Sequence, residues 1–281
     1  MKLYEFVQFH LEEKLIRVIK EAEKELFIAT PYIKDYGIGI ILNNVRTMNL
    51  KILTNLDLAN ISSSGFDIES LSKLWTKFNV SIASLGKLHA KAYIADDKVA
   101  FLTSANLTHG GLRENYEYGV VFRDRDIVSI MLNDINKYFN LGNVFNRETI
   151  EDIKSEVEDI RELRQRIEKN IGLKNLNRLL KQKKDNLQTK ILRNRIKGKT
   201  INSIFAETIK YLLEKEGALS TKELHPFIQN IHPDICDDTV DRVIDGQHFG
   251  KKWKHLVRDA QQSLKKKRLI YLKEKKWHLA S

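Results

Sequence analysis

Apolar positions in the first 145 residues follow two different spacings. In LEEKLIRVIKEAEK, apolar residues recur every three or four positions, which predicts an amphipathic helix that buries Leu11, Leu15, Val18 and Ile19. Short apolar runs predict strands in ELFIATPYI, LKILTNL, VSIASL, KLHAKAYIA, KVAFLTSANL and EYGVVFR. Further helices are expected at 38–46, 67–78 and 126–139. This order predicts the α/β class, with a layered α/β sandwich as domain 1–145.

Residues 146–200 are predicted to form a helical, basic linker. Between 148 and 171 one apolar stripe is expected, made of Ile150, Ile153, Val157, Ile160, Leu163, Ile167 and Ile171. Such a stripe fits either a coiled-coil contact between two subunits or packing against a neighbouring domain. Ten Lys or Arg residues then lie between Lys174 and Lys199, against the single acid Asp185.

A third pattern occupies residues 201–281. A helix is expected to end at Gly217, and Ser220 with Glu223 forms a capping box that begins a second helix. Another short helix is predicted at 238–244, and a longer one spans WKHLVRDAQQSLKKKR. Two short strands, LIYL and WHLA, follow it. Helices that end in such a hairpin are typical of a winged helix-turn-helix domain.

Charge is distributed unevenly along the chain. The net charge is +11, yet residues 1–145 hold 17 basic and 17 acidic side chains, so the excess lies in the C-terminal half. This asymmetry fits either a polyanionic partner or a solvated, lysine-rich surface. The single cysteine, Cys236, and the absence of a long apolar segment lead us to expect a cytoplasmic protein without a membrane partner.

Candidate chemistry gathers in the fourth and fifth predicted strands. His89 and Lys91 are two residues apart and share one face of a strand, as do Ser104 and Asn106, and Glu117 follows eleven residues later. If the chain turns tightly at Asp96, paired residue numbers sum to 193, and His89 then lies opposite Ser104. The pattern therefore predicts a nucleophile, a cation and hydrogen-bond donors at one place.

The spacing resembles the HKD motif of the phospholipase D superfamily, His-x-Lys-x4-Asp-x6-Gly-Ser-x-Asn, with a downstream glutamate. The resemblance covers residues 1–145, and Thr103 stands where the family has glycine. It implies metal-independent hydrolysis of a phosphodiester without a cofactor. Pairing such a core with a winged helix resembles metal-independent restriction endonucleases of this superfamily.

The resemblance also implies a role for each matching residue. His89 would attack phosphorus, and a covalent phosphohistidine would then be hydrolysed by water. Lys91, Ser104 and Asn106 would hold the phosphate oxygens. Glu117 would accept a hydrogen bond from the His89 ring, and Asp96 would be structural or would tune the pair.

The family's reaction uses a second histidine as the general acid, but this chain has one His-x-Lys. The resemblance therefore implies a two-fold homodimer in which each subunit supplies one His89.

The last long predicted helix carries candidate DNA contacts. Arg258, Gln261 and Gln262 are residue types that read base edges, and lysines suit phosphates. The full predicted set is Lys251, Lys252, Lys254, His255, Arg258, Gln261, Gln262, Lys265 and Lys275.

We therefore expect a metal-independent DNA endonuclease of restriction or phage defence. A lipid-directed phosphodiesterase and a non-catalytic DNA-binding regulator are the alternatives, and a helicase or methyltransferase partner is left open.

Overall fold

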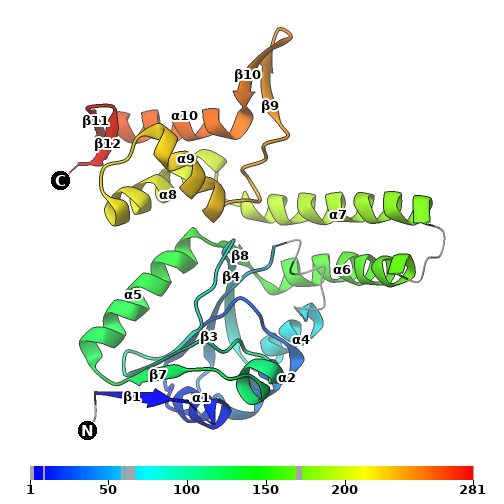
Figure 1. Cartoon of the computed structure of the whole chain (residues 1–281), viewed down its shortest axis with the longest axis vertical. Helices are drawn as coiled ribbons and strands as arrows, with labels where there is room; N and C mark the ends of the chain where they lie inside the picture. Colours follow the sequence, from blue (N-terminus) through cyan, green and yellow to red (C-terminus); the bar gives the residue numbers. More distant parts are fainter. Residues whose placement is uncertain (1–2, 9, 58–59, 61–66, 169–172, 281) are drawn as a thin grey trace. The chain divides into compact units, whose positions relative to one another are not determined.

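The computed structural model describes residues 3–8, 10–57, 60, 67–168 and 173–280. The chain divides into two compact units, Met1–Ile191 and Leu192–Ser281 (Figure 1). Most of the predicted linker, 146–200, belongs to the first unit. Each unit is described separately below.

The first unit is built on a mixed eight-stranded sheet with the order β1-β7-β6-β5-β2-β3-β4-β8. Strands β2, β3 and β4 run parallel, and the other neighbouring pairs are antiparallel. The strands are β1 (Tyr4–Val7), β2 (Glu25–Ala29), β3 (Asn49–Thr54), β4 (Asn79–Ser84), β5 (Ala92–Ala95), β6 (Val99–Thr103), β7 (Gly119–Phe122) and β8 (Asn143–Phe145). β1 and β8 were not predicted.

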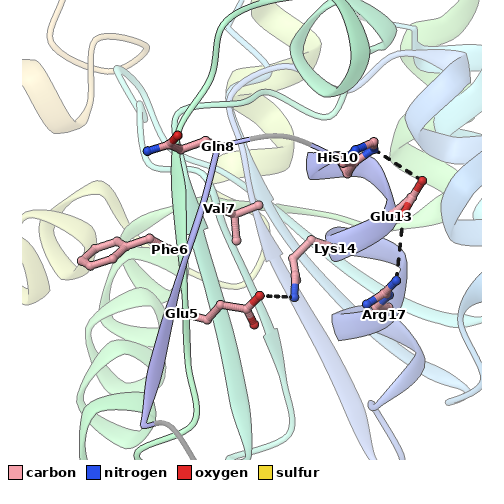
Figure 2. Close-up of a pocket in the computed structure, with 8 residues that line it drawn as sticks. All are labelled: Glu5, Phe6, Val7, Gln8, His10, Glu13, Lys14 and Arg17. Carbon is pink, nitrogen blue, oxygen red and sulfur yellow. Dashed lines mark hydrogen bonds and ion pairs between the residues drawn. The ribbon is translucent and has the colours of Figure 1, made fainter.

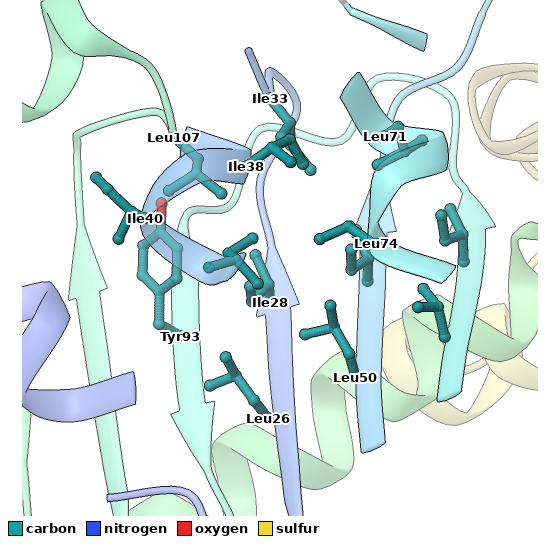
Figure 3. Close-up of a cluster of buried hydrophobic side chains, with 14 of the residues drawn as sticks. Leu26, Ile28, Ile33, Ile38, Ile40, Leu50, Leu71, Leu74, Tyr93 and Leu107 are labelled. Carbon is teal, nitrogen blue, oxygen red and sulfur yellow. The ribbon is translucent and has the colours of Figure 1, made fainter. Parts of the chain in front are cut away.

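Helices cover both faces of this sheet. The main core lies on one face, where Ile28, Leu50 and Tyr93 meet the apolar sides of the neighbouring helices (Figure 3). These helices are α1 (Leu11–Lys20), α2 (Asp35–Asn44), α4 (Ile68–Ser72) and the 3-10 turn η1 (Lys73–Thr76). On the other face, Phe139 of α5 (Arg125–Leu141) packs edge-on against Phe27. The predicted layered α/β arrangement is thus present.

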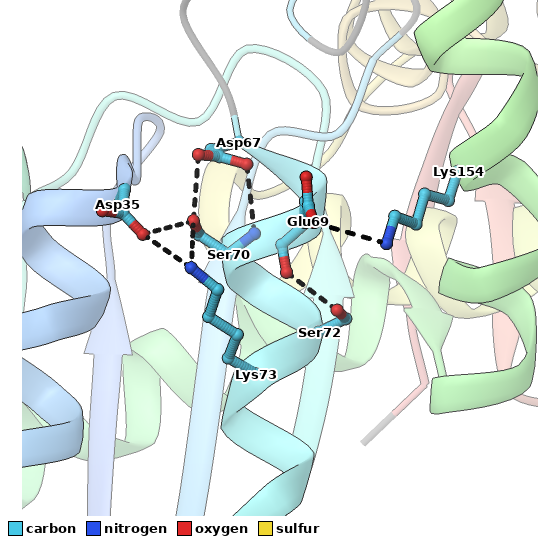
Figure 4. Close-up of polar contacts among 7 residues, drawn as sticks. All are labelled: Asp35, Asp67, Glu69, Ser70, Ser72, Lys73 and Lys154. Carbon is cyan, nitrogen blue, oxygen red and sulfur yellow. Dashed lines mark hydrogen bonds and ion pairs between the residues drawn. The ribbon is translucent and has the colours of Figure 1, made fainter.

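A polar cluster joins α2 to α4 at the end of the sheet where β2 and β3 finish. Ser70 Oγ lies 2.5 Å from Asp35 Oδ1 and 2.9 Å from Asp67 Oδ2, and Lys73 forms an ion pair with Asp35 at 3.0 Å (Figure 4). The hydrogen bond from Ser70 and the Lys73 ammonium lower the pKa of Asp35. The cluster therefore holds these two helices together.

The apolar stripe predicted in the linker is buried within the chain. Helix α6 (Arg147–Glu168) packs on α4, and its residues Ile150, Ile153, Val157 and Ile160 join the main core. Helix α7 (Leu173–Arg195) lies beside it, and Lys183 and Lys190 of α7 pair with Asp159 and Glu156 of α6 at 2.5 Å. Of the two interpretations, packing against a neighbouring element is the one observed, and this part of the stripe is not free for an intersubunit coiled coil.

The second unit contains three helices and two hairpins among its described residues. They are α8 (Ile201–Glu216), α9 (Thr221–Ile231), β9 (Asp241–Ile244), β10 (Gln247–Lys251), α10 (Lys252–Lys266), β11 (Ile270–Lys273) and β12 (Lys276–Leu279). The capping box of Ser220 with Glu223 is present. Leu219 pairs with Trp277 of β12 through an isolated antiparallel bridge, so the terminal hairpin is fastened to the chain between α8 and α9.

The helix predicted at 238–244 is wrong. Residues 241–244 form strand β9, which pairs with β10 around Asp245 and Gly246, both at positive φ (49° and 79°). The physical reason is local: a tight Asp-Gly turn favours a hairpin, and Val243 with Ile244 favours extended backbone. Both strands of this hairpin are largely exposed.

Candidate active site

One edge of the sheet collects most of the predicted catalytic residues. His89 and Lys91 immediately precede β5, Ser104 follows β6, and Glu117 precedes β7. Because β6 runs antiparallel to both β5 and β7, these three strand ends lie at the same edge. β2, β3 and β4 also end there, since β5 is antiparallel to β2.

The predicted register between β5 and β6 is wrong by one residue. Ala92 pairs with Leu102 and Ala95 with Val99, so the pair numbers sum to 194. The turn holds three residues rather than two, with Asp96 in the left-handed region at φ 54°. Lys91, and not His89, thus lies beside the chain that leads to Ser104, and Thr103 N donates to Lys91 O at 3.0 Å.

His89 and Lys91 are in direct contact. Lys91 Nζ lies 3.1 Å from His89 Nδ1 and 3.3 Å from His89 Nε2, and it donates to the His89 carbonyl at 2.9 Å. The His89 side chain is exposed, whereas Lys91 is only 5 % exposed. Burial lowers the pKa of the Lys91 ammonium, and the negative charge of Glu117 opposes that shift. A buried cation therefore stands beside an accessible imidazole.

Ser104 and Glu117 form a second pair at this edge. Ser104 Oγ donates to Glu117 Oε2, and Glu117 Oε1 accepts from Asn115 Nδ2 at 3.3 Å. Tyr118 N donates to Ser104 Oγ at 3.0 Å. The predicted hydrogen bond from His89 to Glu117 is not formed in the described part of the chain, and Asn115 is a neighbour that no sequence signal indicated.

Two further features shape the loop that follows β6. The Thr103 hydroxyl donates to Tyr118 O at 3.1 Å and accepts from Ala105 N at 3.2 Å, so this side chain supports the loop. A Cβ on Gly111 would come within 2.7 Å of Asn106 O, so glycine is needed for the chain to pack on Asn106. Asn106 Oδ1 is buried and has no hydrogen-bond partner among the described residues.

Asp96 lies at the opposite edge of the sheet, directly after β5. Its carboxylate accepts hydrogen bonds from the backbone N–H groups of Glu23 (3.2 Å), Lys24 (2.9 Å) and Glu25 (3.0 Å). Burial raises the pKa of this carboxyl, but the three backbone donors outweigh that effect and lower it overall. The structure does not bring Asp96 to the other site residues, and it has a structural role at the start of β2.

The predicted DNA-contacting residues differ in their surroundings. Gln261 is 1 % exposed, and its Oε1 accepts from Thr221 Oγ1 at 3.3 Å. It therefore faces the interior of the second unit, because α10 turns this position toward α9. This corrects the expectation that Gln261 is available to a base edge.

The remaining predicted contacts are wholly or partly accessible. Lys251 forms an ion pair with Asp241 at 2.9 Å, and His255 lies between Arg242 and the Phe249 carbonyl, 3.0 and 2.7 Å away. Lys254 is half-buried over the ring of Trp253. The exposed ones are Lys252, Arg258, Gln262, Lys265 and Lys275.

An open depression of about 420 Å³ lies between β1 and α1 (Figure 2). Acidic and basic side chains line it, with Lys14 paired to Glu5 at 2.7 Å. None of the predicted catalytic residues lines it. Over the described ranges, no group of three His, Cys, Asp or Glu side chains is placed to hold a metal ion, and no helix is long and apolar enough to cross a membrane.

Comparison with known proteins finds a similarity within the first unit. Residues 15–139, which make up less than half of the chain, match the model described as "Cardiolipin synthase, PLD-like domain". The matched segment contains every residue of the sheet-edge site. No curated protein matches the chain.

Several solved structures are similar in part. NucT from Helicobacter pylori is 18% identical over 48% of this chain and 93% of its own, with a TM-score of 0.39. Nuc from Salmonella typhimurium, a phospholipase D family member, is 14% identical over 51% and 97%, with a TM-score of 0.42. Phosphatidylserine synthase from Haemophilus influenzae is 17% identical over 57% and 43%, with a TM-score of 0.43.

Proposed function

We propose that the protein is a metal-independent endonuclease that hydrolyses DNA phosphodiester bonds at the sheet-edge site. The observation that carries the proposal is the gathering of His89, Lys91, Ser104 and Glu117 at one edge, with the buried Lys91 ammonium against the exposed His89 ring. A phosphate oxygen bound to Lys91 would lie within reach of that ring. A cation and a nucleophile are thus available at one phosphorus without a metal ion.

In the proposed reaction, a His89 ring nitrogen forms a bond to phosphorus while the bond to the leaving oxygen breaks. A general acid gives that oxygen a proton. Water then attacks phosphorus and gives a proton back to the general acid, while the bond from phosphorus to the His89 nitrogen breaks; this releases a strand that ends in a 5′- or 3′-phosphate and restores His89. Lys91, Ser104 and Asn106 would bind the non-bridging oxygens. For Asn106 this requires a flip of the side-chain amide, which puts the NH₂ donor where the unpartnered oxygen now lies.

We propose that a second copy of the chain supplies the general acid. On the face of the sheet that α5 covers only in part, an apolar patch remains exposed: Tyr4, Phe6, Leu102 and Tyr118. Phe6 contacts the rings of both Tyr4 and Tyr118. Because Tyr118 also holds Ser104, docking of two copies through this patch would place two sites side by side.

DNA as the substrate is supported by the basic C-terminal half. Its excess charge and the exposed cations of α10 suit a phosphate backbone. Three helices with a terminal hairpin fastened by the Leu219–Trp277 bridge are what a winged-helix domain would require. A role in restriction or phage defence is part of this proposal.

The test is to incubate the purified protein in excess EDTA with plasmid DNA, RNA and phosphatidylcholine vesicles. We expect DNA cleavage by the wild type and none by His89→Ala, together with an acid-labile phosphate adduct on the wild type. Cleavage that needs Mg²⁺, or that survives in His89→Ala, would refute the mechanism. Hydrolysis of the vesicles alone would support a lipid substrate, and DNA binding without any hydrolysis would support a regulator.

A further inference from the structure

Tyr116 is an aromatic side chain held in solvent beside the candidate active site. Its relative exposure is 103 %, so its ring packs on no other part of the described chain. Tyr4 and Tyr118, by comparison, are about half exposed, and each has a ring contact with Phe6.

The loop that carries Tyr116 is nevertheless anchored on both sides. Asn115 N donates to Gly110 O at 2.9 Å, and the Asn115 side chain donates to Glu117. On the other side, Tyr118 N donates to Ser104 Oγ at 3.0 Å. Asn115, directly before Tyr116, and Tyr118, two positions after it, are therefore each bonded to a member of the Ser104–Glu117 pair, and the backbone of Tyr116 is held at the rim of the site.

We propose that Tyr116 stacks on the base of the nucleotide next to the scissile phosphate, in a single-stranded segment of the substrate. An exposed aromatic ring on an anchored stretch of backbone can bind a base face without an ordering of the loop that carries it. In a duplex the base faces are already covered by their neighbours, so the partner of Tyr116 must be an unpaired base. This inference rests on the proposed function and names the part of the substrate that the site prefers.

Stacking also separates a nucleic-acid substrate from a lipid. A phosphodiester lipid offers no aromatic face beside its phosphate, so its hydrolysis would be indifferent to the ring of Tyr116. Tyr116 is thus a substrate-positioning residue, and the phosphate chemistry belongs to His89 and Lys91.

The test is a cycle of changes in the protein and in the substrate. Wild type, Tyr116→Ala, Tyr116→Phe and Tyr116→Trp are assayed on a single-stranded oligonucleotide whose cleavage position has been mapped. Matched oligonucleotides carry an abasic residue on either side of that position. We expect Tyr116→Ala to raise KM about 10- to 100-fold, with a smaller change in kcat, and Phe or Trp to restore the wild-type value. An abasic neighbour should weaken the wild type equally and cause no further loss in Tyr116→Ala.

The inference is wrong if Tyr116→Ala and the abasic residue raise KM independently, so that their effects multiply. It is also wrong if Tyr116→Ala has the wild-type KM. The competing explanation is that Tyr116 contacts the second copy of the chain, and sedimentation of the same variants tests it. Tyr4→Ala, a change in the exposed apolar patch proposed for that contact, is the matched control. A weaker dimer in Tyr116→Ala with no dependence on the base would assign Tyr116 to the contact between copies. A wild type that cuts no nucleic acid would overturn the proposed function and this inference together, whereas normal cutting by Tyr116→Ala would overturn this inference alone.

Discussion

The sheet edge of the first unit and the surface of α10 in the second differ in how their residues depend on one another. At the edge, Lys91 contacts His89, Ser104 contacts Glu117, and the charges of Lys91 and Glu117 interact. On α10, the exposed residues Arg258, Gln262 and Lys265 point to solvent. The effects of mutations at residues in contact are usually coupled, whereas the effects of mutations at distant residues usually add. We therefore expect cooperative losses at the edge and independent, additive losses on α10.

The strongest test of the edge is a titration of wild-type protein with His89→Ala protein after subunit exchange. If two copies supply one His89 each, the cleavage rate should fall as the square of the wild-type fraction, and pure His89→Ala should lose about 10³-fold or more. The measurement is the initial rate on plasmid DNA in EDTA. A linear fall would mean that each chain cuts alone.

Lys91→Met should separate activity from stability at the same edge. Removal of the cation should lower kcat by about 10²- to 10³-fold. Burial lowers the pKa of Lys91, so the charged form is disfavoured in the folded state, and stability should rise as pH increases through the lowered pKa toward 10.5. Lys91→Met removes this cost, so we expect its Tm at pH 7 to equal or exceed that of the wild type. A large drop in Tm would show that the ammonium supports the fold.

On the second unit, the exposed Lys252, Lys265 and Lys275 should act additively. Their replacement by Gln should weaken DNA binding and reduce the slope of log K against log salt by about 0.9 for each lost phosphate contact. Fluorescence anisotropy at several KCl concentrations measures that slope. Lys20→Gln, a change of an exposed lysine in α1 within the charge-balanced residues 1–145, is the control. An unchanged slope in the triple variant would place DNA on another surface.

Asp96→Asn should affect stability but not the chemical step. The carboxylate accepts three backbone hydrogen bonds, and an amide cannot replace all of them, so we expect a loss of about 1–3 kcal/mol in the free energy of unfolding. Because the folded pKa is lowered, the ionised group adds stability above about pH 4, and that stability is lost as the pH falls through the lowered pKa. Urea titrations at pH 7 and pH 3 should show the variant's deficit shrink at the lower pH. A kcat that falls in the folded variant would return Asp96 to the catalytic set.

The smallest effect is expected from Gln261→Leu. Gln261 is buried and its Nε2 has no partner among the described residues, so the loss of its amide should change stability by less than about 1 kcal/mol. Cleavage positions should stay the same.

Arg258→Ala should instead relax sequence choice if α10 reads bases, at about 1–3 kcal/mol for a bidentate contact. A relaxed choice of cleavage sequence in Gln261→Leu would mean that Gln261 becomes exposed when the protein binds DNA.

Much of the fold was determined by local pattern. The helices around Leu15, Val128, Phe205 and Val257 and the strands from Glu25 to Phe122 follow from apolar spacing alone, because each buries one side against the rest of its unit. The capping box of Ser220 and Glu223 likewise depends only on nearby residues. The spacing of His89, Lys91, Ser104 and Glu117 was sufficient to predict that these residues gather at one place, whereas their catalytic roles stay a prediction.

The tertiary structure decided what depends on residues far apart in the chain. The three-residue turn at Asp96 set the register of β5 on β6, and the backbone N–H groups of Glu23–Glu25 became the partners of the Asp96 carboxylate. Glu117 bonded to Ser104 rather than His89, since the β6–β7 pairing brings those two strand ends together. Gln261 became buried because α10 rotates it toward Thr221. In each case the local pattern allows several partners, and long-range packing selects one.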